Sequence, residues 1–154
     1  MKKILLIATI LILLASSVWA TAVGTITQQV NFFRNPNFAV LTLTCVGSSD
    51  DGTFPSTALS ADTLTKVGDY FITEVRTYPG SVNPTASYDI VFNDAGGLDL
   101  MGGNLIDRSA SAAQRVFPAS YPVPIANDMT VVITNSTVHS AVVVIKVFLT
   151  KYRY

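Results

Sequence analysis

The chain has 154 residues, with ten basic and ten acidic side chains, one histidine and one cysteine. That length suits one domain with a sizeable hydrophobic core. If residues 1–20 are removed with Lys2 and Lys3, eight basic and ten acidic residues remain, a net charge of −2. Such sparse charge argues against nucleic-acid binding by counterion release and against a polybasic membrane patch.

The N-terminus has the layout of a secretory signal. Lys2 and Lys3 precede an apolar run over residues 4–15, and small or apolar residues lead to a cut after Ala20. The uncharged stretch 4–24 is also long enough to cross a bilayer as one helix, so a retained anchor is the alternative. We therefore expect a signal peptide or membrane anchor over 1–20, with membrane contact only through that segment if it is uncleaved. An N-terminal arm or edge strand follows over 21–36, and a β-sandwich domain over 37–154.

The rest of the chain alternates between apolar and polar residues with a period of two, which is typical of half-buried strands. In 38–46, Leu41, Leu43 and Cys45 share one face; in 69–77, the even-numbered positions 70–76 share one face and 71, 73 and 75 the other. The Val- and Ile-rich last segment is expected to be a central strand buried on both faces. The expected strands are 25–30, 38–46, 69–77, 88–93, 129–134 and 141–152. They predict an all-β fold, a single antiparallel β-sandwich of jelly-roll or immunoglobulin-like type.

The remaining segments are expected to be connections. Residues 47–64 and the proline-rich 118–128 read as long loops, and 109–116 reads as a loop or one helical turn before Pro118. No convincing amphipathic helix is expected after the leader. Residues 135–137 are interpreted as the turn of a hairpin that joins 129–134 to 141–149.

Catalytic chemistry has little support in the sequence. His139 is the only histidine, and no Gly-x-Ser-x-Gly elbow accompanies it, so we expect no catalytic residue and no enzyme activity. Cys45 cannot form an intrachain disulfide and is expected to pack as a small hydrophobic residue; an intermolecular disulfide or a reactive thiol is the alternative. One Cys and one His also cannot build a zinc site of the usual kind, and no cofactor is expected.

A weaker hypothesis concerns calcium. Asp94, Asp99 and Asp107 lie in a glycine-rich segment, and oxygen ligands from such loops commonly hold calcium. Their spacing does not match an EF-hand loop. The alternative interpretation is that these aspartates close turns on their own backbone.

Self-association, or contact with other virion or surface proteins, is the favoured interpretation. An unpaired edge strand offers free N–H and C=O groups, so Thr25, Ile26 and Val30 are candidate interaction residues, together with Tyr152 and Tyr154 at the C-terminus. Glycan binding by the loops 47–64 and 98–113 is the competing hypothesis.

Seven short motifs follow one another along the chain: DGTFP at 51–55, YFITEV at 70–75, PG at 79–80, PTASYDI at 84–90, DAGGLD at 94–99, GGNLIDR at 102–108 and MTVVITN at 129–135. This ordered series resembles small structural proteins of tailed bacteriophages and prophages. The resemblance implies a β-sandwich subunit of a virus particle, such as a capsid-decorating or other virion surface protein, and it implies no catalytic residue. The leader-like segment departs from that family, whose members generally lack one. The expected function is thus a non-enzymatic structural subunit of a virus particle or of an exported surface assembly, which acts through homo-oligomeric β-edge and loop contacts. Its expected location is the virion, the extracellular space or the cell surface. A secreted glycan-binding adhesion module is the alternative, and a secreted hydrolase is less favoured.

Overall fold

The computed structural model describes residues 22–120 and 122–151 of the chain. The expected leader, together with Tyr152 and Tyr154, lies outside the described residues. Among those that are described, no helix has the length and apolar character needed to span a bilayer. The elements are β1 (Thr25–Phe32), β2 (Phe38–Val46), β3 (Thr57–Ala58), α2 (Ala61–Val67), β4 (Phe71–Pro79), β5 (Asp89–Asn93), β6 (Gln114–Val116), β7 (Val123–Pro124), β8 (Thr130–Thr134) and β9 (Val142–Thr150).

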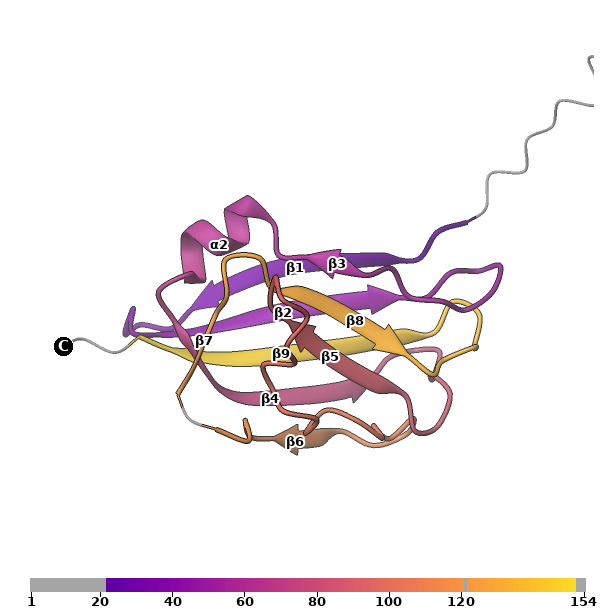
Figure 1. Cartoon of the computed structure of the whole chain (residues 1–154). Coiled ribbons are helices and arrows are strands. Elements are labelled where there is room, and N and C mark those ends of the chain that lie inside the picture. The colour runs from indigo at the N-terminus through magenta and orange to yellow at the C-terminus, as the bar shows by residue number, and fades with distance from the viewer. Residues whose placement is uncertain (1–21, 121, 152–154) are drawn as a thin grey trace, which may run out of the picture.

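The strands form two antiparallel sheets (Figure 1). The larger has the order β1-β2-β9-β4-β6, with β7 also paired to β4, and the smaller has the order β3-β8-β5. The expectation of an all-β, antiparallel fold is confirmed. The six long strands also match the segments in which the apolar residues alternate.

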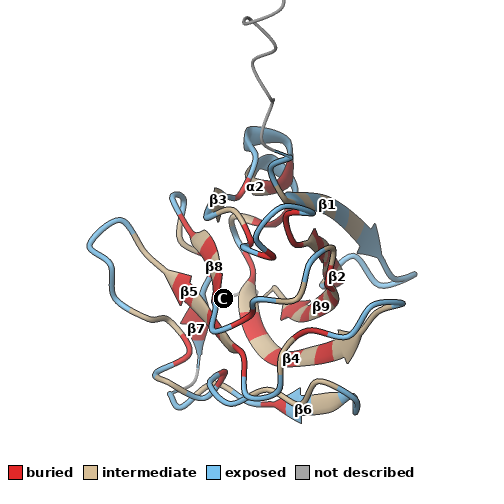
Figure 2. Ribbon diagram, turned by 90° about the vertical axis from the view of Figure 1, so that its right-hand side faces the viewer, coloured by how far each residue is buried: buried red, intermediate tan, exposed pale blue. Residues whose placement is uncertain are grey.

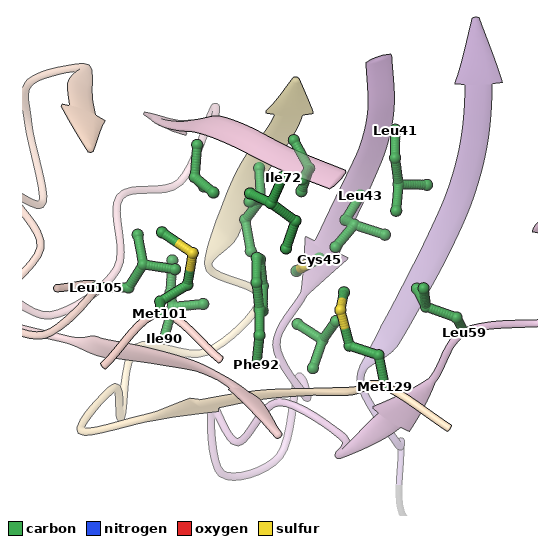
Figure 3. Packing of buried hydrophobic residues seen from close by; sticks show 14 of the residues in the cluster. Leu41, Leu43, Cys45, Leu59, Ile72, Ile90, Phe92, Met101, Leu105 and Met129 are labelled. Atoms are coloured by element: carbon green, nitrogen blue, oxygen red, sulfur yellow. The ribbon is translucent and has the colours of Figure 1, made fainter. Parts of the chain in front are cut away.

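One hydrophobic core lies between the two sheets (Figure 2). Leu41, Leu43 and Cys45 project into it from β2, and Ile90 and Phe92 project into it from β5; all five are fully buried. Figure 3 shows these side chains converging with Met101 and Leu105, which come from the segment after β5. The predicted inward face of β2 and the packing of Cys45 as a small hydrophobic residue are therefore confirmed.

The last strand corrects one expectation. β9 is central, between β2 and β4, as predicted. Only its inward face is fully buried, however, because Val142, Val144 and Phe148 alternate on an outer face that is half-exposed. The valine-rich run is thus not enclosed on both sides by the described part of this chain.

A β-bulge overturns the predicted faces of β4. Ile72 lies opposite Leu149 and Glu74 lies opposite Phe148, so β4 has one residue more than β9 across this interval. Ile72 points to the core before the bulge, and Val75 and Thr77 point to it afterwards. Arg76 therefore lies on the outer face, opposite to the side predicted from strict alternation.

Two predicted loops contain structure, and the expectation of no helix is wrong. α2 begins after Ser60, whose side chain accepts a hydrogen bond from the N–H of Thr63, and Asp62 pairs with Lys66 one turn later. Two-residue strands, β3 and β7, lie in the expected loops 47–64 and 118–128. β6 replaces the expected loop or helical turn over 109–116, because it pairs with β4.

The predicted hairpin over 135–137 is also wrong. β8 pairs with β5 and β3 in the small sheet, whereas β9 pairs with β2 and β4 in the large one. The connection crosses between sheets, and Asn135 and Ser140 both have positive φ where the chain changes direction. Ser136 is buried between them and accepts a hydrogen bond from the N–H of Thr85.

Candidate interaction surface

The outer edge of β1 is the principal candidate site. β1 pairs with β2 from Thr25 opposite Val46 to Phe32 opposite Ala39, and the N–H of Phe33 donates to the carbonyl of Phe38 at 3.2 Å. Hydrogen-bonded and non-hydrogen-bonded pairs alternate along an antiparallel ladder. Because Phe33 bonds to β2 and the pairs alternate, the main-chain groups of the odd-numbered residues of β1 are the ones that bond to β2. The main-chain groups of the even-numbered residues therefore point away from β2, and these residues are Ile26, Gln28, Val30 and Phe32.

This edge has no main-chain partner within the described residues. The side chain of Gln28, on the core-facing side of β1, donates to the carbonyl of Ala58 at 2.8 Å and accepts from the N–H of Ser60 at 2.9 Å, so the segment that leads into α2, and α2 itself, lie beside this strand. Ile26 and Val30 pack half-buried against the core, while Thr25 is exposed on the outer face. Figure 2 shows β1 at the rim of the large sheet, with much of its surface exposed.

The remaining sheet edges are short or covered. The segment 98–108 runs along β5. The N–H of Leu100 donates to the carbonyl of Phe92 at 2.8 Å, and the N–H of Arg108 donates to the carbonyl of Tyr88 at 2.7 Å. β3 and β7 have two residues each, and β6 has three. In the part of the chain that the structure describes, β1 is thus the one long edge left open.

Exposed aromatic side chains gather where β1 turns into β2. Phe32, Phe33 and Phe38 are each about half exposed, at 49%, 55% and 48%. The ring of Phe32 lies 6.3 Å from that of Tyr70, whose hydroxyl donates to the carbonyl of Pro36 and so fixes the turn. We call Phe32, Phe33 and Phe38 the aromatic tip. Exposed apolar clusters of this kind commonly mark contact surfaces.

The open edge also lacks the devices that keep edge strands apart. β1 reads TITQQVNF, with neither a charged residue nor a proline. Soluble proteins usually place lysine or proline on such an edge to prevent pairing with another chain. Nothing in the composition of β1 opposes the addition of a strand.

The C-terminal candidates, Tyr152 and Tyr154, lie beyond the last described residue, Lys151. The N–H of Lys151 donates to the carbonyl of Asn37 at 2.8 Å, and its ammonium lies 5.7 Å from the centre of the Tyr70 ring. The end of β9 therefore lies beside the aromatic tip.

Sequence reasoning missed a cationic cluster on the outer face of the large sheet. Glu74 receives hydrogen bonds from Arg76 and from Arg115, the latter at 2.7 Å, and Arg76 stacks over Phe148 at 4.4 Å. Burial by itself raises the pKa of the Glu74 carboxyl, but the hydrogen bonds and charges of the two arginines outweigh it and hold that pKa below its usual range. The bulge in β4 creates this cluster, and no sequence signal indicates the bulge.

The calcium candidates do not converge. Asp94 accepts hydrogen bonds from the N–H groups of Gly96 and Leu98, and Asp99 accepts from those of Met101 and Gly103. Asp107 is exposed and has a positive φ. Within residues 22–120 and 122–151, no group of three or more His, Cys, Asp or Glu side chains is placed to hold a metal ion. The geometry of Asp94 and Asp99 is that of turn closure.

The other candidates are dispersed. His139 is exposed in the connection from β8 to β9, and none of its hydrogen bonds within the described residues joins it to a serine or aspartate. Of the two proposed glycan loops, 47–64 contains β3 and the start of α2, and 98–113 includes the segment that runs along β5. A shallow depression of about 310 Å³ adjoins the second loop, lined by residues that include Leu98, Asp99 and Pro124.

Comparisons with protein-family models, curated proteins and solved structures found no match for this chain.

Proposed function

We propose that this chain is a non-enzymatic structural subunit of a virus particle or of an exported surface assembly. It acts by self-association, in which β1 accepts a strand from a neighbouring subunit and loops make further contacts. The two-sheet arrangement supports a sandwich of jelly-roll or immunoglobulin-like type as the building block. No comparison bears on the resemblance to phage structural proteins, which remains part of the proposal.

The observation that carries the proposal is the open edge of β1. Four residues present main-chain groups that have no partner among the described residues, and a neighbouring strand of equal length would form up to about eight backbone hydrogen bonds with them. At about 0.5–1.5 kcal/mol each, these contribute roughly 4–12 kcal/mol. Association costs about 4–15 kcal/mol, so main-chain pairing alone gives a weak complex. Burial of the aromatic tip supplies the additional free energy that a lasting assembly needs.

The experiment is a measurement of native mass against concentration for the full-length protein and two lysine variants. Gln29→Lys places a charge in the middle of the exposed side of β1. Thr65→Lys places the same charge on the exposed surface of α2 and is the matched control. We expect the wild type and the Thr65→Lys variant to associate, and Gln29→Lys to raise the dissociation constant by about tenfold or more.

Two outcomes decide the matter. A wild-type protein that stays monomeric at high concentration and is absent from any particle contradicts the proposal. Equal association of the Gln29→Lys and Thr65→Lys variants removes β1 as the contact. Determination of the N-terminal residue of the purified protein then distinguishes an exported surface assembly from a virus particle. A start at Thr21 indicates export, and an intact Met1 in a virion indicates a particle component.

A further inference from the structure

We infer that the occupant of the open edge is a second copy of this chain, paired β1 to β1 in antiparallel orientation, with Gln29 on the two-fold axis. This inference rests on the proposed function and specifies its contact. The result is one continuous sheet that runs through both subunits. Each subunit contributes the same surface, as two-fold symmetry requires.

The ladder geometry limits the register. The even-numbered residues of β1 are the ones whose main-chain groups face the open edge. When two copies pair, these residues must lie opposite one another in hydrogen-bonded pairs. In the register centred on Gln29, Ile26 lies opposite Phe32 of the second copy, and Gln28 lies opposite Val30. All four edge-facing residues are then used in both subunits. A shift of the axis by one residue, to Gln28 or Val30, leaves one of the four without a partner in β1.

The exposed apolar residues favour the same register. Val23, just before β1, is 72% exposed, and Phe33, just after it, is 55% exposed. Antiparallel pairing about Gln29 sets Phe33 opposite Thr25 of the second copy and diagonally beside Val23. Diagonal neighbours lie within reach of aromatic side chains in a sheet. One arrangement therefore covers an isolated apolar residue at each end of the same strand.

Electrostatics and space are compatible with self-pairing. A charged residue near the axis would face its own copy, and β1 contains none. The connection to α2 meets β1 through the core-facing side chain of Gln28, whereas Thr27, Gln29 and Asn31 are exposed on the opposite face. That face continues across both subunits without an intervening element among the described residues.

Disulfide formation between introduced cysteines tests the register in the full-length protein. Gln29 opposite Gln29 is a non-hydrogen-bonded pair with Cα atoms about 4.5 Å apart, which a disulfide can bridge. Thr27 lies opposite Asn31 of the second copy in an equivalent pair. Cys45 is buried, and burial raises the pKa of its thiol to about 12, so it does not compete as a thiolate.

We expect Gln29→Cys alone to give a covalent dimer under mild oxidation, and Thr27→Cys mixed with Asn31→Cys to give one as well. Thr27→Cys alone and Asn31→Cys alone are the controls, and each should give about tenfold less dimer because its own copy lies too far along the strand. A dimer from Thr27→Cys mixed with Gln29→Cys, and none from Gln29→Cys, overturns the register. Absence of all these disulfides in a protein whose native mass shows assembly overturns β1 self-pairing and leaves the proposed function standing. A monomeric native mass removes both.

Discussion

Tyr88 provides a direct test of how polar groups are accommodated in the core. Its side chain is completely buried at the start of β5, and neither its hydroxyl nor that of Thr77 has a hydrogen-bond partner of acceptable geometry among the described residues. Burial raises the pKa of the Tyr88 hydroxyl, although the neighbouring Thr77 hydroxyl acts in the opposite direction. The two hydroxyls thus influence each other without forming a full hydrogen bond.

The substitution Tyr88→Phe removes the hydroxyl and keeps the ring, so that almost no cavity forms. Burying a hydroxyl without a partner costs about 1–3 kcal/mol in protein mutational data. Because Thr77 offsets part of that cost, we expect a gain of about 1 kcal/mol in the free energy of unfolding. For a domain of this size that corresponds to a rise in Tm of roughly 3–5 °C.

Urea denaturation and thermal unfolding of the wild type, Tyr88→Phe, Thr77→Val and the double variant form the assay. The double variant should be at least as stable as Tyr88→Phe, because it leaves no orphaned hydroxyl at this place in the core. A loss of about 1 kcal/mol or more in the free energy of unfolding of Tyr88→Phe would contradict this expectation. It would mean that the hydroxyl makes a stabilising hydrogen bond.

Three further predictions concern the ion cluster, a turn and the cysteine. The pKa of Glu74 is lowered in the folded state, so its ionised carboxylate stabilises the fold above the unfolded pKa of about 4.3, and this stabilisation is lost as the pH falls through the folded pKa. In parallel denaturant titrations, the free energy of unfolding of Glu74→Gln should therefore fall less between neutral and acidic pH than that of the wild type. Gly52→Ala should cost at least about 2 kcal/mol, since its φ is +76° and a Cβ would lie 2.5 Å from the Thr137 carbonyl carbon, whereas Gly97→Ala, with similar φ and open space, should cost less by the same assay. Cys45 should react with a thiol reagent only at the rate of unfolding; rapid labelling of the native protein would show that the core opens locally.

The long strands were predictable because their signal is local. Alternation in Phe38–Val46 places Leu41 and Leu43 inward whatever the rest of the chain does. The bulge after Ile72 was not predictable, because nothing local shows where β4 gains a residue relative to β9. β3, β6 and β7 exist only through their partners and carry too few residues for a period to appear. α2 did leave a signal, the cap at Ser60 followed by Asp62 and Lys66, but it is brief.

The candidate site was predictable only in part. Thr25 to Val30 appeared as a strand, and the structure places it at the sheet edge. That it remains uncovered depends on where α2 and the segment 98–108 pack, which the sequence does not indicate. The aromatic tip was missed because Phe32, Phe33 and Phe38 resemble core residues in composition, and only the turn fixed by Tyr70 leaves them outside.

The segment that runs along β5 has a consequence for how large an assembly can grow by strand addition. A subunit with two open sheet edges can add further subunits without limit, as amyloid does. A subunit with one open edge stops at a dimer. β5 is an edge of the smaller sheet, and by covering it residues 98–108 would limit strand addition in the proposed assembly to β1, at the edge of the larger sheet. Substitutions at Asp94 and Asp99, whose side chains close the turns in this region, should uncover β5 and convert the proposed dimers into fibres.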